Sequence, residues 1–261
     1  MDGIQGRISP QELYKLIGIA GAPVVIDVRR PDDFDADDAQ IVGAIRRSPD
    51  QIDQWRLAIP KGRRVVVYCA SGGKVSQDVA TALAATGADA GYVEGGIAAW
   101  RERELPTRRR VGTAPSAWVT RERPTIDRIA CPWLVSRFID PEAEFIYVPA
   151  ATVMETAERT GATPYDVANV AFGHHGELCS FDAFVRIYGI SDNALDRLAL
   201  IVRGADTGRL DLTPQSQGLL AISQGLKVNF ADDHVMLAQG MVVYDAVYAW
   251  CRLQSQQRIR P

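Results

Sequence analysis

Two patterns of apolar residues divide the chain. Up to about residue 103, short runs rich in valine and isoleucine alternate with stretches that have helical spacing. The predicted strands are "PVVIDVR", "VGAIRR", "RRVVVYC" and "AGYVEGG". The helix after the third strand has its apolar face at Val75, Val79, Leu83 and Thr86, and a capping box in "SPQE" predicts an earlier helix. Strands that alternate with helices predict an α/β fold, with a parallel sheet covered by helices on both faces.

The second half has a different pattern. One strand is expected at "EFIYVP", and the remainder has helical periodicity, so we predict a mostly α-helical domain. Its last helix, over about residues 232–253, is apolar almost all round and is expected to be buried at the centre of the domain. The stretch "ELPTRRRVGTAPSA" between the halves has two prolines and an arginine run, which is typical of a linker. We predict domains at residues 1–106 and 118–261, joined by a linker at 107–117.

Composition and charge limit the classes of function that the chain can have. The chain has 261 residues, 47% of them hydrophobic, and a net charge of −3, so no basic field favours nucleic acid as a partner. No signal peptide is evident, and no apolar run is long enough to cross a membrane. The four cysteines form no CxxC pair, which fits a protein of the reducing cytoplasm without disulfides or zinc fingers. The oligomeric state is left open.

The strongest candidate for chemistry is Cys69, in "VVVYCASGGKVS". It follows a buried strand and precedes a helix, at the edge of a parallel sheet where ligand sites lie. Backbone amides and the helix dipole there favour a thiolate, and the two glycines after it allow close approach. The alternative is a buried cysteine that only packs. Phosphatases of a related fold need an arginine six residues after the cysteine to bind phosphate. This chain has Val75 at that position, so the spacing disfavours a phosphatase.

These residues carry a family resemblance. With "VVIDVRRPDDFD", "IVGAI" and "YVEGGIAAWRERELP", the cysteine loop resembles a single rhodanese (sulfurtransferase) domain over residues 5–106. The resemblance implies that Cys69 carries a persulfide and needs no cofactor. The residues that would bind substrate around it are Ala70, Ser71, Gly72, Gly73, Lys74, Val75 and Ser76. Asp27 with Arg29, and Gly95–Gly96 with Trp100, match the family's structural positions.

The match to this family has departures. The family usually has arginine at the position of Lys74, often has another at Ala70, and commonly has histidine at the position of Gln40. Lysine lacks the bidentate fork of arginine, so we expect weak thiosulfate binding. The expected partners are therefore a small-molecule or protein sulfur donor other than thiosulfate and an acceptor thiol. A vestigial sulfurtransferase is the alternative.

The second half contains all three histidines. His174 and His175 lie in "FGHHGELCSFD", and His234 lies in "FADDHVML". Imidazole, thiolate and carboxylate are ligands for transition metals such as iron or zinc. Helix caps and surface pairs are the alternative. The candidate metal ligands are His174, Asp206 and His234, with Cys179 and Asp182 as further candidates.

A second dense stretch, "WVTRERPTIDRIACPWLVSRFIDPEAEF", interleaves arginines with tryptophans. It suggests either an oxyanion pocket, with Arg128 as a ligand, or ion pairs on a helix surface. Together with "GELCSFD", "IVRGAD" and "ADDHVMLAQGMVVYDAVYAWC", it resembles the C-terminal domain of chromate-resistance protein B over residues 116–256. The resemblance implies a link to chromate stress and favours His174 over His175.

The sequence therefore predicts a cytoplasmic sulfurtransferase coupled to a domain that binds a metal or an oxyanion such as chromate. Two alternatives stay open. One is a chromate- or metal-responsive sensor with a passive rhodanese module, and the other is an iron-dependent redox enzyme.

Overall fold

The computed structural model describes residues 6–59, 62–112, 114 and 116–257. It divides into two compact units. Unit 1 contains residues 1–110 and 137–141, and unit 2 contains residues 111–136 and 142–261. Parts of both predicted domains and of the linker, at residues 1–5, 60–61, 113, 115 and 258–261, lie outside the described residues. No described helix is long and apolar enough to cross a bilayer.

Unit 1 is built on a parallel sheet of five strands in the order β1-β6-β5-β2-β4. A separate antiparallel pair joins β3 and β7. The strands are β1 (Arg7–Ile8), β2 (Val24–Asp27), β3 (Ala39–Ile41), β4 (Ala44–Arg46), β5 (Val65–Tyr68), β6 (Ala90–Val93) and β7 (Thr107–Arg109). The helices are α1 (Pro10–Leu16), α2 (Pro31–Asp35), α3 (Ile52–Trp55), α4 (Lys74–Ala84) and α5 (Gly96–Glu102), with short 3₁₀ turns η1 (Pro49–Gln51) and η2 (Arg56–Ala58).

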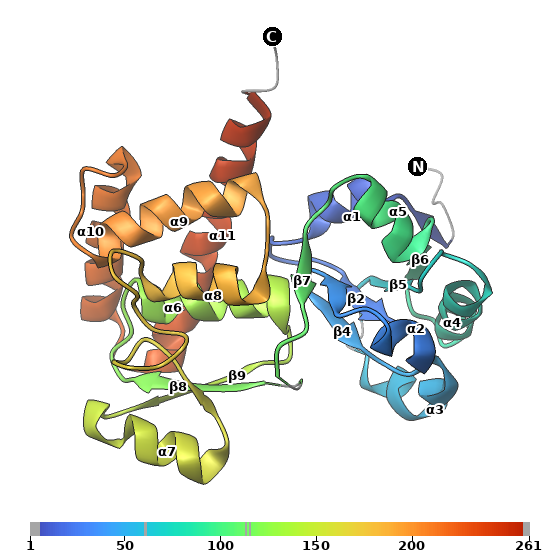
Figure 1. The fold of residues 1–261 in the computed structure, drawn as a ribbon, viewed down its shortest axis with the longest axis horizontal. Helices are drawn as coiled ribbons and strands as arrows, with labels where there is room; N and C mark the ends of the chain where they lie inside the picture. The colour runs from blue at the N-terminus through green and yellow to red at the C-terminus, as the bar shows by residue number, and fades with distance from the viewer. Residues whose placement is uncertain (1–5, 60–61, 113, 115, 258–261) are drawn as a thin grey trace. The chain divides into compact units, whose positions relative to one another are not determined.

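The two faces of this sheet are covered by different helices, as predicted (Figure 1). Val65 and Val67 of β5 pack with Trp55 of α3 and Leu83 of α4 in one apolar core. Because side chains alternate along a strand, Val66 and Tyr68 point to the opposite face. The helices α1 and α5 lie together, with the rings of Tyr14 and Trp100 edge to face at 6.2 Å. The predicted capping box at Ser9 and Glu12 is present.

The predicted linker begins in regular structure. Residues 107–109 form β7, which pairs with β3 in unit 1. Arg108 is 7% exposed, and its guanidinium donates to the carbonyl of Ala44 at 3.1 Å. The arginine run of the predicted linker is therefore partly buried, because its first two residues belong to this small sheet.

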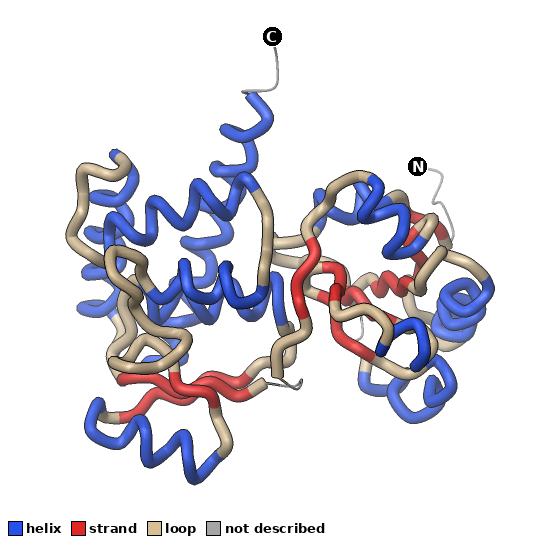
Figure 2. Tube along the Cα trace, viewed as in Figure 1, coloured by secondary structure: helices blue, strands red, loops and turns tan. Residues whose placement is uncertain are grey.

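Unit 2 is mostly helical, as predicted, and Figure 2 shows how little strand it contains. Its helices are α6 (Asp127–Leu134), α7 (Val153–Thr160), α8 (Ser180–Tyr188), α9 (Asn193–Asp206), α10 (Pro214–Asn229) and α11 (Asp233–Gln257). A 3₁₀ turn, η4 (Ala150–Thr152), precedes α7, and a π-helical turn, η3 (Val135–Ile139), follows α6 and crosses the division between the units. Its parallel sheet has the order β10-β8-β9, formed by β8 (Ala117–Arg121), β9 (Glu144–Val148) and β10 (Thr163–Pro164).

Two expectations for unit 2 are wrong. The sheet has three strands where one was predicted: β10 has only two residues, and the five residues of β8 run directly into the arginine-rich stretch. The last helix, α11, is not buried all round. Met236, Tyr244 and Tyr248 are at most 2% exposed, whereas Val242 on the opposite face is 64% exposed.

Candidate functional site

Cys69 lies where the sequence predicts, in the turn between the carboxyl end of β5 and the start of α4. It is 6% exposed, and its Sγ is 3.2 Å from Oγ of Ser76 in the first turn of α4. Ser76 is held in turn, because its hydroxyl donates to the carbonyl of Gly73 at 3.1 Å. The sulfur therefore lies at the N-terminal end of α4, where the helix dipole is positive.

The loop rests directly on the start of α5. The amides of Ile97 and Ala98 donate to the carbonyls of Cys69 and Ala70, each at 3.0 Å. Gly96 has φ +60°, and a Cβ there would collide with the Cys69 carbonyl and the Gly72 amide. The two glycines of the family's terminal signature thus have different physical roles: Gly96 lets the cysteine loop pack closely, and Gly95 avoids a collision with the Ala99 side chain.

The predicted substrate-binding residues form one short loop. Within the described residues, no backbone or side-chain oxygen accepts a hydrogen bond from the amides of residues 70–76. Ser71 and Lys74 are exposed at the rim. The side chain of Gln77 donates to the carbonyl of Gly72 at 3.0 Å and braces the loop from α4. The loop amides are therefore available to a small electron-rich guest next to the sulfur.

A buried polar network lies beneath this loop. Arg29 is 1% exposed, and its Nε and Nη2 donate to both carboxylate oxygens of Asp27 at 2.7–3.1 Å. The hydroxyl of Tyr68, the residue before Cys69, donates to Asp27 at 2.9 Å, and Gln40 Nε2 donates to it at 3.3 Å. Burial and the Asp27 charge raise the pKa of Tyr68 well above its usual value. Gln40, which stands at the family's histidine position, therefore still supplies a hydrogen-bond donor to Asp27.

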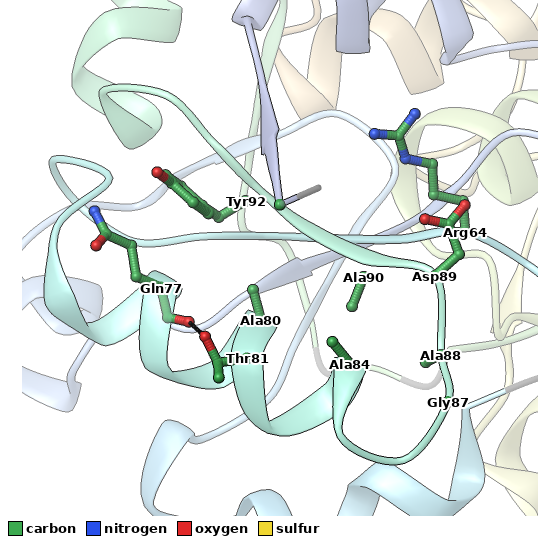
Figure 3. A pocket seen from close by; sticks show the side chains of 11 residues that line it. Arg64, Gln77, Ala80, Thr81, Ala84, Gly87, Ala88, Asp89, Ala90 and Tyr92 are labelled. Carbon is green, nitrogen blue, oxygen red and sulfur yellow. Dashed lines mark hydrogen bonds between the residues drawn. The ribbon is translucent and has the colours of Figure 1, made fainter. Parts of the chain in front are cut away.

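A cavity of about 740 Å³ in unit 1 lies elsewhere. Figure 3 shows it between α4 and β6, with a floor of alanines and polar side chains from Arg64, Gln77 and Asp89 at its edge. Cys69 does not line it. This cavity is therefore separate from the Cys69 loop.

In unit 2, His174 is surrounded by three carboxylates. Its Nε2 lies 3.0 Å from Asp206, 3.4 Å from Asp166 and 3.5 Å from Asp127. One ligand atom from each of Asp127, His174 and Asp206 lies within 4.8 Å of the others, so these three residues could hold a metal ion. Asp127 is 1% exposed, and its Oδ1 has no hydrogen-bond partner within the described residues.

Strained backbone positions two of these carboxylates. Ile126, directly before Asp127, has φ 31° and ψ −97°, which a β-branched residue rarely adopts. Its amide donates to Ser223 Oγ at 3.2 Å, and Tyr244 donates to its carbonyl at 3.0 Å. Asp166 itself has φ 51°. Such strain persists only where the surrounding structure enforces it, and it is frequent at functional sites.

The residues around His174 shift one another's pKa values. Hydrogen bonds to Asp127 and Asp166 raise the pKa of His174 to about 10. Burial, with the charges of Asp127 and Asp166, raises the pKa of Asp206 to about 7, and burial also raises the pKa of Asp127. Burial opposes ionisation of Asp166, but hydrogen bonds from His174, Ser180 and Arg121 outweigh it and lower its pKa. At neutral pH the positive charge of His174 thus balances part of the negative charge of the carboxylates.

The cluster opens to a small cavity of about 380 Å³, lined by Arg121, Asp166 and His174 among others. Arg121 donates to Asp166 at 2.9 Å. Arg128, predicted as an oxyanion ligand, lies 3.3 Å from Asp166 through Nε and donates to the Glu122 carbonyl at 2.9 Å. Both arginines are therefore engaged with the chain itself and balance the charge of the carboxylates.

Other predicted ligands lie outside this group. The ring of His234 packs against Tyr147, with centroids 5.5 Å apart. Asp182 receives two hydrogen bonds from Arg203, at 2.6 and 2.9 Å. Cys179 is not one of the three residues but borders them, because its side chain contacts the Asp127 carboxyl; it is fully buried as the N-cap of α8, and burial raises the pKa of its thiol. Asp182 belongs to the same capping box, so the alternative interpretation of it as a cap is confirmed.

Sequence reasoning did not identify two members of the cluster as ligands. Asp127 lies in the arginine-rich stretch, whose pattern favours an oxyanion pocket or surface ion pairs. Asp166 stands in "PYDVAN", without a histidine or cysteine nearby, and gave no signal. Only tertiary structure brings it to His174.

Comparison with known proteins agrees with this division. The profile of the family "ChrB, C-terminal domain" matches residues 118–251, just over half of the 261 residues. The chain belongs to this family. The profile "Rhodanese-like domain" matches residues 9–103, so the predicted rhodanese-like domain precedes the ChrB domain.

Protein ChrB of Cupriavidus metallidurans is 30% identical over 132 residues, 50% of this chain. The match spans only 39% of that relative's length. Among solved structures, a rhodanese-related protein from Thermoplasma volcanium is 25% identical and covers 39% of this chain and 96% of its own, with a TM-score of 0.35. A rhodanese-like domain protein from Staphylococcus aureus is 30% identical and covers 36% of this chain and 90% of its own, with a TM-score of 0.32.

Proposed function

We propose that the rhodanese-like domain is a sulfurtransferase that carries a persulfide on Cys69. The observation that carries this is the Cys69 loop: the sulfur is nearly buried, and the amides of the next residues, 70–76, have no hydrogen-bond acceptor within the described part of the chain. A persulfide's outer sulfur is small and electron-rich, and amide donors aimed at it stabilise negative charge without a metal or a cofactor. The match of residues 9–103 to the rhodanese-like domain supports the proposal, because Cys69 stands in the cysteine loop that resembles that of the family.

The chemistry needs no external oxidant when the donor already holds a sulfane sulfur. The Cys69 thiolate attacks that sulfur, the S–S bond of the donor breaks, and the donor leaves as a thiolate or sulfite with the electron pair. A nucleophilic acceptor thiolate then attacks the outer sulfur, and Cys69 leaves as a thiolate. The loop amides hold the charge at both stages.

Lys74 bears on the choice of sulfur donor. It is exposed at the rim of the loop, where the family usually has arginine. Lysine acts as a point charge and cannot grip a sulfonate bidentately, so a neutral or protein-bound persulfide donor suits this loop better than thiosulfate. We expect Lys74→Arg to raise the turnover of thiosulfate several-fold while leaving transfer from a persulfide donor unchanged. Equal effects on both donors would contradict this role of Lys74.

For the ChrB domain we propose a divalent transition-metal centre held by Asp127, His174 and Asp206, with iron or zinc as the expected ion. Its support is the buried Asp127 Oδ1 without a partner, next to an imidazole and further carboxylates. One imidazole with carboxylates suits borderline and hard divalent ions. When bound, such an ion would supply Lewis-acid chemistry or, if it is iron, one-electron chemistry.

Metal content of the purified full chain tests this centre. Mass spectrometry of metals should find a stoichiometric ion in the wild type and a loss in His174→Ala and in Asp206→Asn. His234→Ala is the matched control, because this histidine packs on Tyr147 outside the group. Metal retained in the first two variants, or lost equally in the control, would contradict the assignment.

We further propose that the two activities serve the response to chromate or metal stress in a reducing cytoplasm. Support comes from membership in the ChrB family and from four cysteines that are all free and buried. A sensor in which the metal centre is the working part and Cys69 is passive is the second candidate, favoured by the strained backbone at that centre. Deletion of the gene with complementation by Cys69→Ser or His174→Ala under chromate separates the two.

A further inference from the structure

The small sheet of unit 2 has the topology of a ligand-binding α/β sheet. The chain runs from β8 through α6 to β9 and then through α7 to β10, and both strand pairs are parallel. Because the order is β10-β8-β9, the chain leaves the middle strand toward one edge and then crosses to the other. Figure 1 shows α6 and α7 on opposite faces of this sheet. In such sheets ligands bind outside the carboxyl ends of the strands, at the point where the direction reverses, here between β8 and β10.

A cavity of about 380 Å³ lies at this point. Arg121 is the last residue of β8, Ala150 stands two positions after the end of β9, and Asp166 stands two positions after the end of β10. All three residues line the cavity, and so does His174. The metal centre proposed above therefore borders a ligand-sized space at the switch point of the sheet.

Arg121 has hydrogen-bond donors left for a ligand. Its side chain is 43% exposed. Its Nη2 donates to Asp166 at 2.9 Å, and its Nη1 donates to no described residue. A guanidinium carries five N–H donors and binds a carboxylate through two of them, so one contact with Asp166 does not saturate it. Arg121 can therefore hold an anionic group in the cavity.

The charges of the cluster set the charge of the ligand. Its three carboxylates are balanced in part by Arg121 and Arg128, which lie 2.9 and 3.3 Å from Asp166. A divalent ion held with His174 as a neutral ligand would leave the whole group with one positive charge. Three protein ligands also leave a coordination position open, as in catalytic metal sites. A ligand with one negative charge is thus favoured, and this inference rests on the metal centre proposed above.

The remaining lining sets the size and polarity of the ligand. Ala150, Val167 and Ala168 contribute short apolar side chains. A bare oxyanion has nothing to cover them, whereas a short carbon chain removes them from water. The cavity is near the lower end of the size range of ligand pockets, about 300–1,000 Å³, so a long chain does not fit. We propose that it binds a small monocarboxylic acid, with the carboxylate on Arg121 and the carbon chain on these three residues.

Calorimetric titration of the full, zinc-loaded chain tests the ligand class. Butyrate should bind with a dissociation constant of about 1 mM or below. Butyramide, which has the same shape without the charge, and sulfate, which has the charge without a carbon chain, should each bind at least about tenfold more weakly. Absence of butyrate binding, or equal binding of sulfate or butyramide, would overturn the proposal.

Variants test the role of Arg121. Arg121→Gln should weaken butyrate binding at least about tenfold and keep the zinc content, because this residue is not among the proposed metal ligands. Arg159→Gln, at an exposed arginine of α7 in the same unit, is the matched control and should bind like the wild type. Equal affinities of the two variants, with both folded by circular dichroism, would overturn the assignment of Arg121.

Zinc content of the same samples separates this inference from the metal centre. A chain that holds zinc but does not bind butyrate would overturn the inference and leave the centre standing. A chain without zinc that still binds butyrate through Arg121 would contradict the metal centre and support the carboxylate site. A chain with neither property would overturn both.

Discussion

Replacing Gly96 by alanine tests how the Cys69 loop is held. Gly96 opens α5 with φ +60°, and a Cβ there would collide with the Cys69 carbonyl and lie 2.6 Å from the Gly72 amide. Gly87, in the same unit, has φ +85° and nothing within 4 Å of a Cβ. Alanine at Gly87 should therefore lower the free energy of unfolding only through its left-handed backbone, by about 1–2 kcal/mol. At Gly96 a backbone collision adds to this, and overpacking typically costs about 1–3 kcal/mol more.

Peptide-resolved hydrogen exchange measures both variants in the intact chain. Protection of β5 should fall little in Gly87→Ala and by roughly a further 5- to 150-fold in Gly96→Ala, which corresponds to the added 1–3 kcal/mol. Protection of α9, in unit 2, is the internal control and should not change. The rate of persulfide loading should fall only in Gly96→Ala, because the collision displaces the loop. Equal protection and equal loading rates in the two variants would refute the claim that the Cys69 loop is held by its contact with α5.

Three further outcomes follow from other contacts. Arg29→Met should destabilise unit 1 by about 3 kcal/mol, since it strands the buried Asp27; urea unfolding should show a smaller loss in the double variant with Asp27→Asn, and additive losses would contradict the pairing. In metal-free protein, the raised pKa of His174, about 10 against 6.5, gives stability that is fully present below pH 6.5 and is lost as the pH rises through about 10. Urea unfolding of unit 2 should show this decline, and His174→Gln should flatten it; an unchanged slope would exclude His174 as its cause. Ser76→Ala removes the contact of 3.2 Å to the sulfur and should slow persulfide loading up to about tenfold. Unchanged loading would mean that the hydroxyl does not act on the sulfur.

The first domain could be predicted closely because its signals are local. Val65–Tyr68 is a continuous apolar run, Cys69 and its glycines follow at once, and the apolar face of the next helix is periodic. Each of these features is contained in a few neighbouring residues. The fit of Gly96 against the loop could not be seen in the same way, since it joins residues 27 positions apart only after the sheet has formed.

The second site shows the limit of spacing arguments. His174 and Asp206 were expected together, and the structure brings them to 3.0 Å. His234 was grouped with them because histidine is scarce in the chain, yet it packs on an aromatic ring. Asp166 reaches the cluster through a positive-φ turn after β10, a backbone state that an aspartate does not signal in sequence.

The most direct test of sulfur transfer by Cys69 is the intact mass of the chain after brief exposure to a persulfide donor. Wild-type protein should gain one sulfur atom, about 32 Da, that a thiol acceptor removes, and Cys69→Ser should gain none while Cys131→Ser behaves like the wild type. Loading that survives in Cys69→Ser, or wild-type chain that takes up no sulfur from any donor, would contradict the assignment of Cys69 as the sulfur carrier.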